Sequence, residues 1–312
     1  MRATDLDPIL VFATSDKGGT GRSVTSCNIA YRLWMSGLDV AYVDFDFGSP
    51  TAGALFEISG AERGVTEGSG LHSYLSGAIN EPVRLNVVRE TDRTELRRDA
   101  PRGRSLVLLP GEIGGGEFGY DDVSVVRAAT LLGQLMTEFD VVIVDLSAGR
   151  SAALDIALGA TASAVLSNRK RRWLVFHRWT RQHVLAASGL VHGPHGILAT
   201  AAARGHNKAA FQASMRCVRT AVAESDSTRA VDSAQDTWVK VQAEALQKLA
   251  NKEEIGAAML LGQTPIEPML QWREQIILDN DVGARLANPS TVDAYTKLAR
   301  HLTDPAIWDS SR

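Results

Sequence analysis

Short apolar runs alternate along the chain with segments whose apolar residues recur at helical spacing. Residues 9–14 (ILVFAT) and 40–45 (VAYVDF) have the length and composition of strands that are buried on both faces. Between these runs an apolar stripe predicts a helix that ends at Gly37, and the stripe consists of Val24, Cys27, Tyr31 and Trp34. Strands that alternate with helices indicate an α/β protein.

The same alternation continues toward the C-terminus. Further strands are predicted at 105–109, 140–146, 162–166, 196–200 and 257–261, the last followed by a turn at 262–265. Helices are predicted at 125–136 and after a capping-box pattern at 290–293, with Tyr295, Leu298 and Leu302 on one face. Because parallel strands are joined by right-handed crossovers, the pattern predicts a doubly wound, mostly parallel sheet with helices on both faces.

Two regions interrupt this pattern, and no Pro-, Gly- or Ser-rich linker separates them from the rest. Residues 60–104 are polar and rich in Gly and Arg, so we expect an exposed excursion. Residues 206–252 are predicted to form one or two long helices, with Trp238 and Leu249 on one stripe. We therefore expect a single domain over 1–312 that carries an excursion and a helical insertion.

The composition excludes several classes of protein. The chain has 312 residues, of which 45% are hydrophobic and 22% charged, enough for a large core and too apolar for a disordered chain. No apolar run is long enough to cross a membrane and no apolar signal segment opens the chain, so we expect a cytoplasmic protein without a membrane partner. The two cysteines, Cys27 and Cys217, form no pattern typical of disulfide frameworks or iron–sulfur sites.

Residues 16–23 (DKGGTGRS) are the main candidate for chemistry, because they lie between a predicted strand and a predicted helix. Glycines permit positive φ angles, so such a loop can turn successive backbone N–H groups inward toward phosphate oxygens. The following helix adds its free N–H groups and the positive end of its dipole. Ser23 would supply a hydroxyl to Mg²⁺. The sequence therefore predicts a phosphate-binding site.

At this point the chain resembles a known family. KGGTGRS at 17–23 looks like the deviant Walker A motif of the ParA/MinD group of P-loop ATPases, and DFDFGSP at 44–50 looks like that family's D-x-D segment. DVVIVDLSAG at 140–149 is similar to its Walker B strand and switch II, and 261–302 follows its last strand, Pro-containing loop and closing helix. The resemblance implies a P-loop NTPase that binds ATP and Mg²⁺ and forms a homodimer on ATP binding.

The resemblance also implies a role for each matching residue. The nucleotide would contact Gly18, Gly19, Thr20, Gly21, Arg22, Ser23, Val24, Gly149 and Pro265. Mg²⁺ would be held by Ser23, Asp44 and Asp145 at the carboxyl ends of strands, where doubly wound sheets bind ligands. Of the two catalytic residues implied, Asp46 would position or deprotonate the attacking water, and Lys17 would reach the nucleotide of the partner subunit.

Three departures from the family pattern bear on function. Arg22 replaces the usual Walker lysine, and its planar guanidinium has a different shape from an ammonium, so binding could survive while hydrolysis slows. Val24 stands where many relatives have a Thr or Ser that contacts the α-phosphate. Residues 199–202 (ATAA) lack the Asn that reads adenine in relatives, so a preference for adenine over guanine is implied only by the family.

We expect an ATP-dependent dimerising switch with slow Mg²⁺-dependent hydrolysis, used to partition or position DNA or protein cargo. Arg22 and Val24 motivate the alternative, a non-hydrolysing nucleotide-dependent scaffold or regulator that recruits a protein partner. A third alternative, a P-loop kinase or ligase with a small-molecule acceptor, is not supported, because the sequence contains no pattern typical of an acceptor site.

The charge is distributed unevenly along the chain. Residues 156–223 hold ten Lys or Arg and no Asp or Glu, although the whole chain has a net charge of −3. Basic residues interleaved with aromatic ones suit non-specific contact with DNA, and the candidates are Arg169, Lys170, Arg171, Arg172, Arg178 and Arg181. The competing expectation is that these cations pair with carboxylates from the acidic remainder of the chain.

Overall fold

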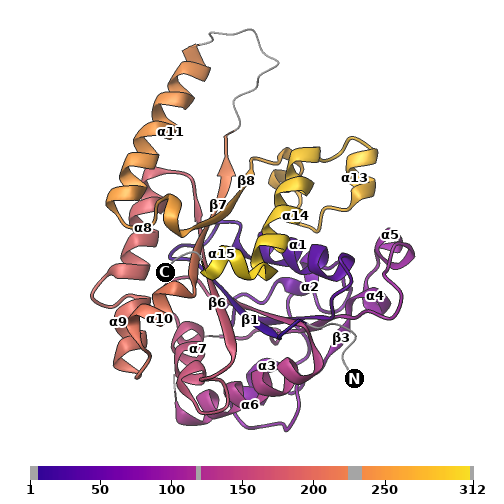
Figure 1. Ribbon diagram of the computed structural model, residues 1–312. Coiled ribbons are helices and arrows are strands. Elements are labelled where there is room, and N and C mark those ends of the chain that lie inside the picture. The colour runs from indigo at the N-terminus through magenta and orange to yellow at the C-terminus, as the bar shows by residue number, and fades with distance from the viewer. Residues whose placement is uncertain (1–5, 117–120, 224–233, 310–312) are drawn as a thin grey trace.

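An eight-stranded sheet forms the centre of the part of the chain that the structure describes (Figure 1). The structure is a computed structural model that describes residues 6–116, 121–223 and 234–309. The strand order is β3-β4-β2-β5-β1-β6-β7-β8, and only β3 is antiparallel to its neighbour. The strands are β1 (Ile9–Thr14), β2 (Val40–Phe45), β3 (Leu85–Asn86), β4 (Leu106–Leu109), β5 (Val141–Leu146), β6 (Lys170–Arg178), β7 (Met215–Val222) and β8 (Leu260–Pro265). The predicted doubly wound fold is confirmed.

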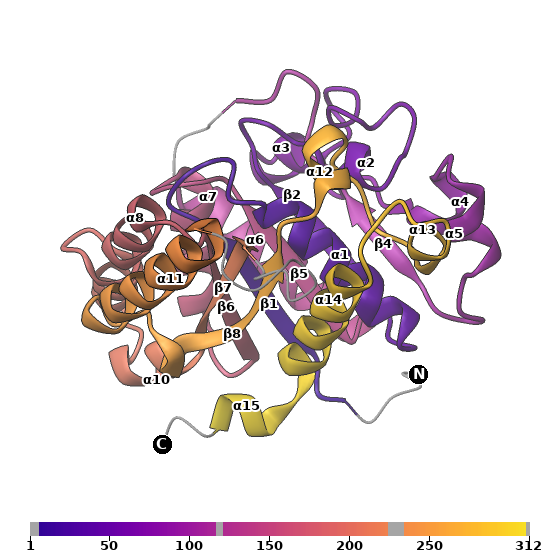
Figure 2. The same cartoon turned by 90° about the horizontal axis from the view of Figure 1, so that it is seen from above.

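Helices cover both faces of the sheet (Figure 2). One face carries α1 (Arg22–Met35) and α14 (Pro289–Thr303), and the other carries α6 (Asp122–Glu138), α7 (Ala152–Ala162) and α8 (Arg181–His192). Alternate residues of β1 enter the two cores that result, which explains why this strand is apolar at nearly every position.

The other helices are shorter, apart from α11 (Ala234–Lys252), which extends beyond the end of the sheet (Figure 1). They are α2 (Ala52–Leu55), α3 (Leu71–Leu75), α4 (Val87–Glu90), α5 (Thr94–Arg98), α9 (Ile197–Ala203), α10 (Lys208–Ala213), α12 (Pro268–Trp272), α13 (Asp279–Gly283) and α15 (Pro305–Asp309). None of the helices in the described ranges is long and apolar enough to cross a membrane.

The 60–104 region is less exposed than its composition predicts. It contains β3, which extends the sheet at one edge, and the helices α3, α4 and α5. Leu71 and Leu75 of α3 pack into one core, and Val87 and Leu96 pack into the other. The polar residues of the segment therefore surround a small set of apolar anchors, and the segment is part of the fold rather than an excursion from it.

Several predicted strands and turns are wrong. Residues 162–166 form the end of α7 and a following turn, and 196–200 belong largely to α9. The strand predicted at 257–261 begins later, at Leu260, and continues as β8 through the predicted turn at 262–265. α14 begins at Pro289 with Asn288 as N-cap and no side-chain cap, so the predicted capping box at 290–293 does not form. Short Ala-rich runs carry no period that separates a strand from a helix.

The 206–252 region was predicted to be helical, and in its first half this is wrong. It contains α10, then β7, then α11, and part of it, 224–233, lies outside the described residues. β7 pairs with both β6 and β8, so it belongs to the body of the sheet. Arg216 and Arg219 interrupt its apolar pattern, although both are buried. A prediction based on hydrophobicity therefore does not identify this segment as a strand.

Candidate functional site

The carboxyl ends of β1, β2 and β5 meet at one edge of the sheet. β1 leads into the loop 15–21, β2 leads into Asp46, and β5 carries Asp145 and leads into Ser147. Asp44 of β2 is in register with Asp145 of β5, so two acidic side chains lie on neighbouring strands. The topology therefore brings the predicted loop and the predicted carboxylates together at the edge where doubly wound sheets bind ligands.

The loop has the backbone conformation that phosphate binding requires. Gly19 and Gly21 have φ angles of 68° and 74°, which L side chains rarely adopt. Gly21 is the N-cap of α1 and has no side chain to satisfy the first N–H groups of the helix. Lys17, Gly18 and Gly19 are exposed, whereas Thr20 is buried. The loop thus presents backbone N–H groups beside a helix N-terminus, an arrangement suited to anions.

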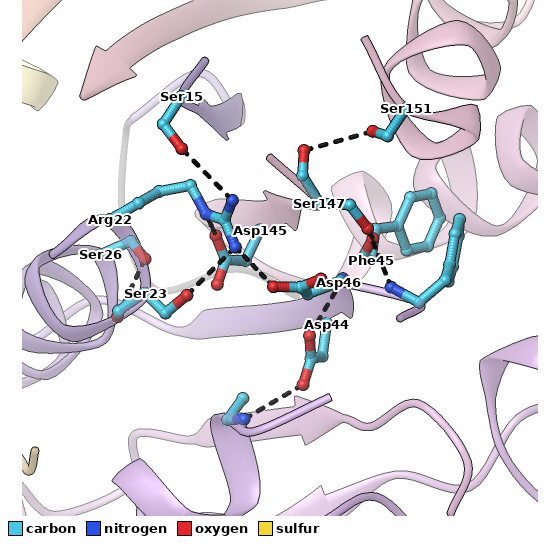
Figure 3. A network of polar contacts seen from close by, with 12 residues as sticks. Ser15, Arg22, Ser23, Ser26, Asp44, Phe45, Asp46, Asp145, Ser147 and Ser151 are labelled. Carbon is cyan, nitrogen blue, oxygen red and sulfur yellow. Dashed lines mark hydrogen bonds and ion pairs between the residues drawn. The ribbon is translucent and has the colours of Figure 1, made fainter. Parts of the chain in front are cut away.

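Arg22 lies under this loop and points into the acidic cluster (Figure 3). Its Nε donates to Asp145 Oδ1 at 2.5 Å, and its Nη2 donates to Asp46 Oδ2 at 2.8 Å and to Ser23 Oγ at 3.3 Å. Nη1 reaches Ser15 Oγ at 3.5 Å. The guanidinium therefore links the loop to both carboxylates, and only 6% of Arg22 is exposed.

Electrostatics hold Arg22 in its charged form. Burial disfavours the cation, but the charges of Asp145 and then Asp46 outweigh burial and raise the pKa of Arg22 above its usual value. The two carboxylates and the guanidinium therefore form a cluster of charges that are paired with one another within the protein.

Asp44 has a different environment from Asp46 and Asp145. Its Oδ1 accepts a hydrogen bond from the backbone N–H of Asp46 and its Oδ2 accepts one from Ala52, each at 3.1 Å (Figure 3). Burial, followed by the charge of Asp145, raises the pKa of Asp44 to about 8. This carboxyl fixes the turn between β2 and α2 instead of facing the loop.

The arrangement does not fit a divalent cation. Asp46 and Asp145 are engaged by Arg22, Ser23 Oγ accepts from the same guanidinium, and Asp44 is bonded to backbone N–H groups. Within 6–116, 121–223 and 234–309, no group of three or more His, Cys, Asp or Glu is placed to hold a metal ion. Of the three residues assigned to Mg²⁺ by the family resemblance, Ser23 and Asp145 are bonded to Arg22, and Asp44 is bonded to the backbone of the turn between β2 and α2.

A pocket of about 270 Å³ opens beside the loop. Val24 and Pro265, both predicted to contact the nucleotide, lie in its wall together with Gly19, Thr20, Gly21, Thr25, Arg178, Thr220, Ala221, Thr264, Glu267, Leu270, Gln271, Glu274 and Tyr295. The pocket therefore adjoins the anion-binding part of the loop, and its walls come from α1, β7, β8 and the segment after β8.

Two hydrogen-bonded residues set the shape of this pocket. Thr220, at the end of β7, donates from Oγ1 to the carbonyl of Thr20 at 2.5 Å and so fixes the loop to the sheet. Glu267 is buried and accepts from Thr291 Oγ1 at 2.7 Å and from the backbone N–H of Asn288 at 2.9 Å. Its carboxylate fixes the segment after β8 against α14, which leaves Gln271 and Glu274 at the exposed rim.

Switch II is also tied to the loop. Gly149 has a φ of 77°, and its N–H donates to the carbonyl of Ser15 at 2.7 Å. Arg150 follows and donates to Asp16 at 3.3 Å and to the carbonyl of Gly189 at 2.8 Å. The N–H of Gly149, a residue expected to contact the nucleotide, is thus bonded within the protein in this structure.

β6 separates the predicted DNA-contacting residues into two groups. Arg169 and Lys170 lie near its start, whereas Arg178 ends it and Arg181 begins α8, at the edge that carries the loop. Arg178 and Arg181 are exposed. A single basic face over 169–181 does not form, because a strand rather than a loop and helix occupies this segment.

Arg171 and Arg172 are not placed for contact with DNA. Arg171 donates from Nη1 to the carbonyl of Thr161 at 2.7 Å, at the end of α7. Arg172 is 2% exposed, and its guanidinium lies 4.5 Å from the centre of the Trp308 ring. The competing expectation of carboxylate pairing holds for Arg204, which pairs with Asp155 at 2.8 Å, but Arg171 and Arg172 bind a carbonyl and an aromatic ring instead.

Several contacts of the site could not be predicted from the motifs. Ser15 and Arg150 each stand beside a motif and not within it. Thr220 was hidden by the failure to recognise β7. Glu267 lies in the Pro-containing loop, but no local pattern predicts its burial or its hydrogen bond with Thr291.

Comparisons with known proteins agree with this fold. The model of the CobQ/CobB/MinD/ParA nucleotide binding domain matches residues 11–266. Among curated proteins, none matches this chain in sequence.

Solved structures with the same fold include a chain of the MinC:MinD cell division protein complex of Aquifex aeolicus, with a TM-score of 0.59 and 17% identity over 95% of both chains. A plasmid partition protein of Borrelia burgdorferi B31 bound to AMPPNP has a TM-score of 0.58 and 14% identity over 95% of this chain and 98% of that one. MinD of Pyrococcus horikoshii with Mg-ADP has a TM-score of 0.52 and 15% identity over 96% of this chain and 97% of that one. The loop, the sheet and the family match together show that the chain belongs to the CobQ/CobB/MinD/ParA family of nucleotide-binding domains.

Proposed function

We propose that this protein is a ParA/MinD-type switch that responds to nucleotide occupancy and recruits a protein partner, with little or no hydrolysis. The observation that carries the proposal is the double ion pair of Arg22 with Asp46 and Asp145 beneath a phosphate-binding loop. It favours the non-hydrolysing alternative over the ATPase that the family resemblance implies.

Nucleotide binding is supported by two adjoining features. The N–H groups of 18–23 and the start of α1 suit the phosphates, and the pocket beside Val24 and Pro265 suits the nucleoside. Arg178 lines the same pocket and adds a positive charge. We propose an adenine nucleotide, since a plasmid partition relative was solved with AMPPNP and a MinD relative with Mg-ADP.

Hydrolysis is disfavoured by the state of Asp46. A general base must be free to accept a proton from the attacking water. Here the Asp46 carboxylate is bonded to the Arg22 guanidinium at 2.8 Å, so this oxygen is not free to accept a proton from water while the ion pair is formed. An arginine does not give up its own proton under ordinary conditions, so the pair cannot relax by proton transfer.

The output we propose is a nucleotide-dependent homodimer that binds a partner protein. Lys17 is exposed at the front of the loop, where it can reach the nucleotide of the partner subunit as the family resemblance implies. A MinD relative was solved in the MinC:MinD complex, which supports a protein partner. In such a switch, contacts made only in the nucleotide-bound state determine whether the dimer forms.

A second candidate is the hydrolysing switch that positions DNA or protein cargo. Asp46 is 22% exposed, so it remains within reach of water if Arg22 moves. Exposed Arg178 and Arg181 lie at the same edge and provide a surface for DNA phosphates.

Calorimetry with ATP and ADP, combined with turnover measurements, tests the proposal. We expect a measurable heat of binding, turnover of the native protein at the background level, and ATP-dependent dimerisation in light scattering. Arg22→Lys, which restores the family residue and loosens the hold on Asp46, should raise turnover. Absence of heat with every purine nucleotide would overturn nucleotide binding, and rapid native turnover would favour the second candidate.

A further inference from the structure

Arg22 stands at the position of the Walker lysine, and its guanidinium also contacts residues that the family resemblance assigns to a metal ion. Its Nε and Nη2 contact Asp145, Asp46 and Ser23, which include the oxygens that Mg²⁺ would share with nucleotide phosphates. We infer that the Arg22 guanidinium is the resident cation of this site, so that nucleoside di- and triphosphates bind without a divalent metal. The inference rests on the proposed nucleotide binding and adds that this binding does not require a divalent metal.

The donor geometry of Arg22 supports a bridging role. A guanidinium has five N–H donors in a fixed plane. One is used on Asp145, and the two of Nη2 point to Asp46 and Ser23. Nη1 has a single contact in the described ranges, with Ser15 Oγ at 3.5 Å, the outer limit of a hydrogen bond. Nη1 can therefore donate to a phosphate oxygen while the other two nitrogens keep their carboxylates, as a metal ion does when it bridges protein and phosphate.

Charge argues against a metal beside Arg22. A divalent cation on Asp145 would lie next to the guanidinium, and the two cations would repel each other in a buried environment. To admit the metal, Arg22 would have to leave both carboxylates and the Ser23 hydroxyl together. Asp44 is bonded through both of its oxygens to backbone N–H groups, which hold its carboxylate at the turn between β2 and α2.

Lysine at position 22 should behave differently. An ammonium is a compact charge on a flexible stem and lacks the planar fork that spans Asp145 and Asp46 at once. Arg22→Lys would therefore leave part of the carboxylate pair without a counter-charge, and Mg²⁺ would become favourable there. Arg32→Lys is the matched control, because Arg32 is a buried arginine of the same helix that pairs with Asp279 at 2.6 Å outside the site.

The test measures affinity for fluorescent ADP and ATP analogues by anisotropy, with excess Mg²⁺ and with EDTA, using the full chain. We expect the native protein and Arg32→Lys to change Kd by less than about threefold between the two conditions, and Arg22→Lys to lose about tenfold or more in EDTA. Thermal unfolding checks that each variant is folded, and the native comparison decides the question if Arg22→Lys is not.

A native affinity that falls about tenfold or more in EDTA would overturn the inference and leave nucleotide binding intact. Absence of binding under both conditions would overturn the proposed function and the inference with it. The two failures are therefore distinguishable.

Discussion

Two buried arginines, Arg22 and Arg172, lie at opposite edges of the same sheet and are stabilised in opposite ways. Arg22 is held by Asp46 and Asp145, and these charges raise its pKa above the usual value. The Nη1 of Arg172 donates no hydrogen bond within the described ranges, and burial lowers the pKa of Arg172 to about 10. Its guanidinium lies 4.5 Å from the centre of the Trp308 ring, and the guanidinium of Arg216 lies 4.8 Å from the centre of the same ring.

The difference distinguishes a cation that can act on a ligand from one that packs the fold. Arg22 has a nitrogen directed toward the loop and partners whose charge a ligand or metal would disturb. Arg172 instead connects β6 to α15 through the contact of its guanidinium with the Trp308 ring. Burial of a basic side chain is therefore not enough to identify a functional residue. The groups that the side chain contacts, carboxylates for Arg22 and an aromatic ring for Arg172, distinguish the two cases.

The largest expected effect comes from replacing each arginine with methionine. Arg22→Met leaves Asp46 and Asp145 without their cation and should lower the free energy of unfolding by about 3–5 kcal/mol. Arg172→Met keeps an apolar stem and removes a cation that forms no ion pair with a carboxylate of the described residues, so the change should stay within about 1 kcal/mol. Chemical denaturation at neutral pH measures both. Equal losses would mean that the two edges do not differ as described.

The second prediction concerns His177, which shares with Arg172 both its strand and its dominant cause of pKa shift. Burial, followed by the charges of Arg219 and His183, lowers the pKa of His177 to about 4, although its N–H bond to the Arg178 carbonyl opposes the shift. The unfolded chain binds this proton near pH 6.5 and the folded protein only near pH 4, so stability falls as pH decreases through that window.

The loss attributable to His177 should reach up to about 3 kcal/mol by pH 4. His177→Gln should reduce the difference in unfolding free energy between pH 6.5 and pH 4 by this amount, measured by urea denaturation. His195→Gln is the control, because His195 is exposed. An unchanged slope in His177→Gln would show that His177 titrates normally in the folded protein.

The contrast between the two arginines also shows how far the sequence could predict this molecule. β1, β2, β5 and the loop were predictable because continuous apolar runs end in glycines or carboxylates. β6 and β7 were not, because each carries a buried arginine whose guanidinium lies over Trp308, a residue remote in the sequence. The pairing of Arg22 with Asp145 spans 123 positions, so the sequence supplied both residues but not their contact.

A smaller effect is expected from Trp308, the aromatic partner of Arg172. Trp308→Leu keeps an apolar side chain against β6 but removes the ring that both guanidinium groups contact, and should cost about 1–2 kcal/mol. Trp272→Leu is the control, because Trp272 is 92% exposed. Combining Trp308→Leu with Arg172→Met tests the contact, since the two losses should sum to more than the loss in the double variant. Additive losses would show that the contact between Arg172 and the Trp308 ring does not contribute to stability.

The smallest expected effect concerns the exposed cations at the amino and carboxyl ends of the parallel strands. It tests which of these two edges contacts DNA, if the chain binds DNA. Arg181 lies at the loop edge near exposed Arg178 and Lys17, whereas Arg169 lies at the far edge. Neither Arg169 nor Arg181 has a carboxylate partner within the described ranges. Each contact with a DNA phosphate contributes about 0.9 to the slope of log affinity against log salt concentration. Arg181→Gln should reduce that slope for duplex DNA by about this amount, and Arg169→Gln should not. The opposite result would place DNA at the edge of Arg172, away from the loop, and DNA binding could then not respond directly to the nucleotide.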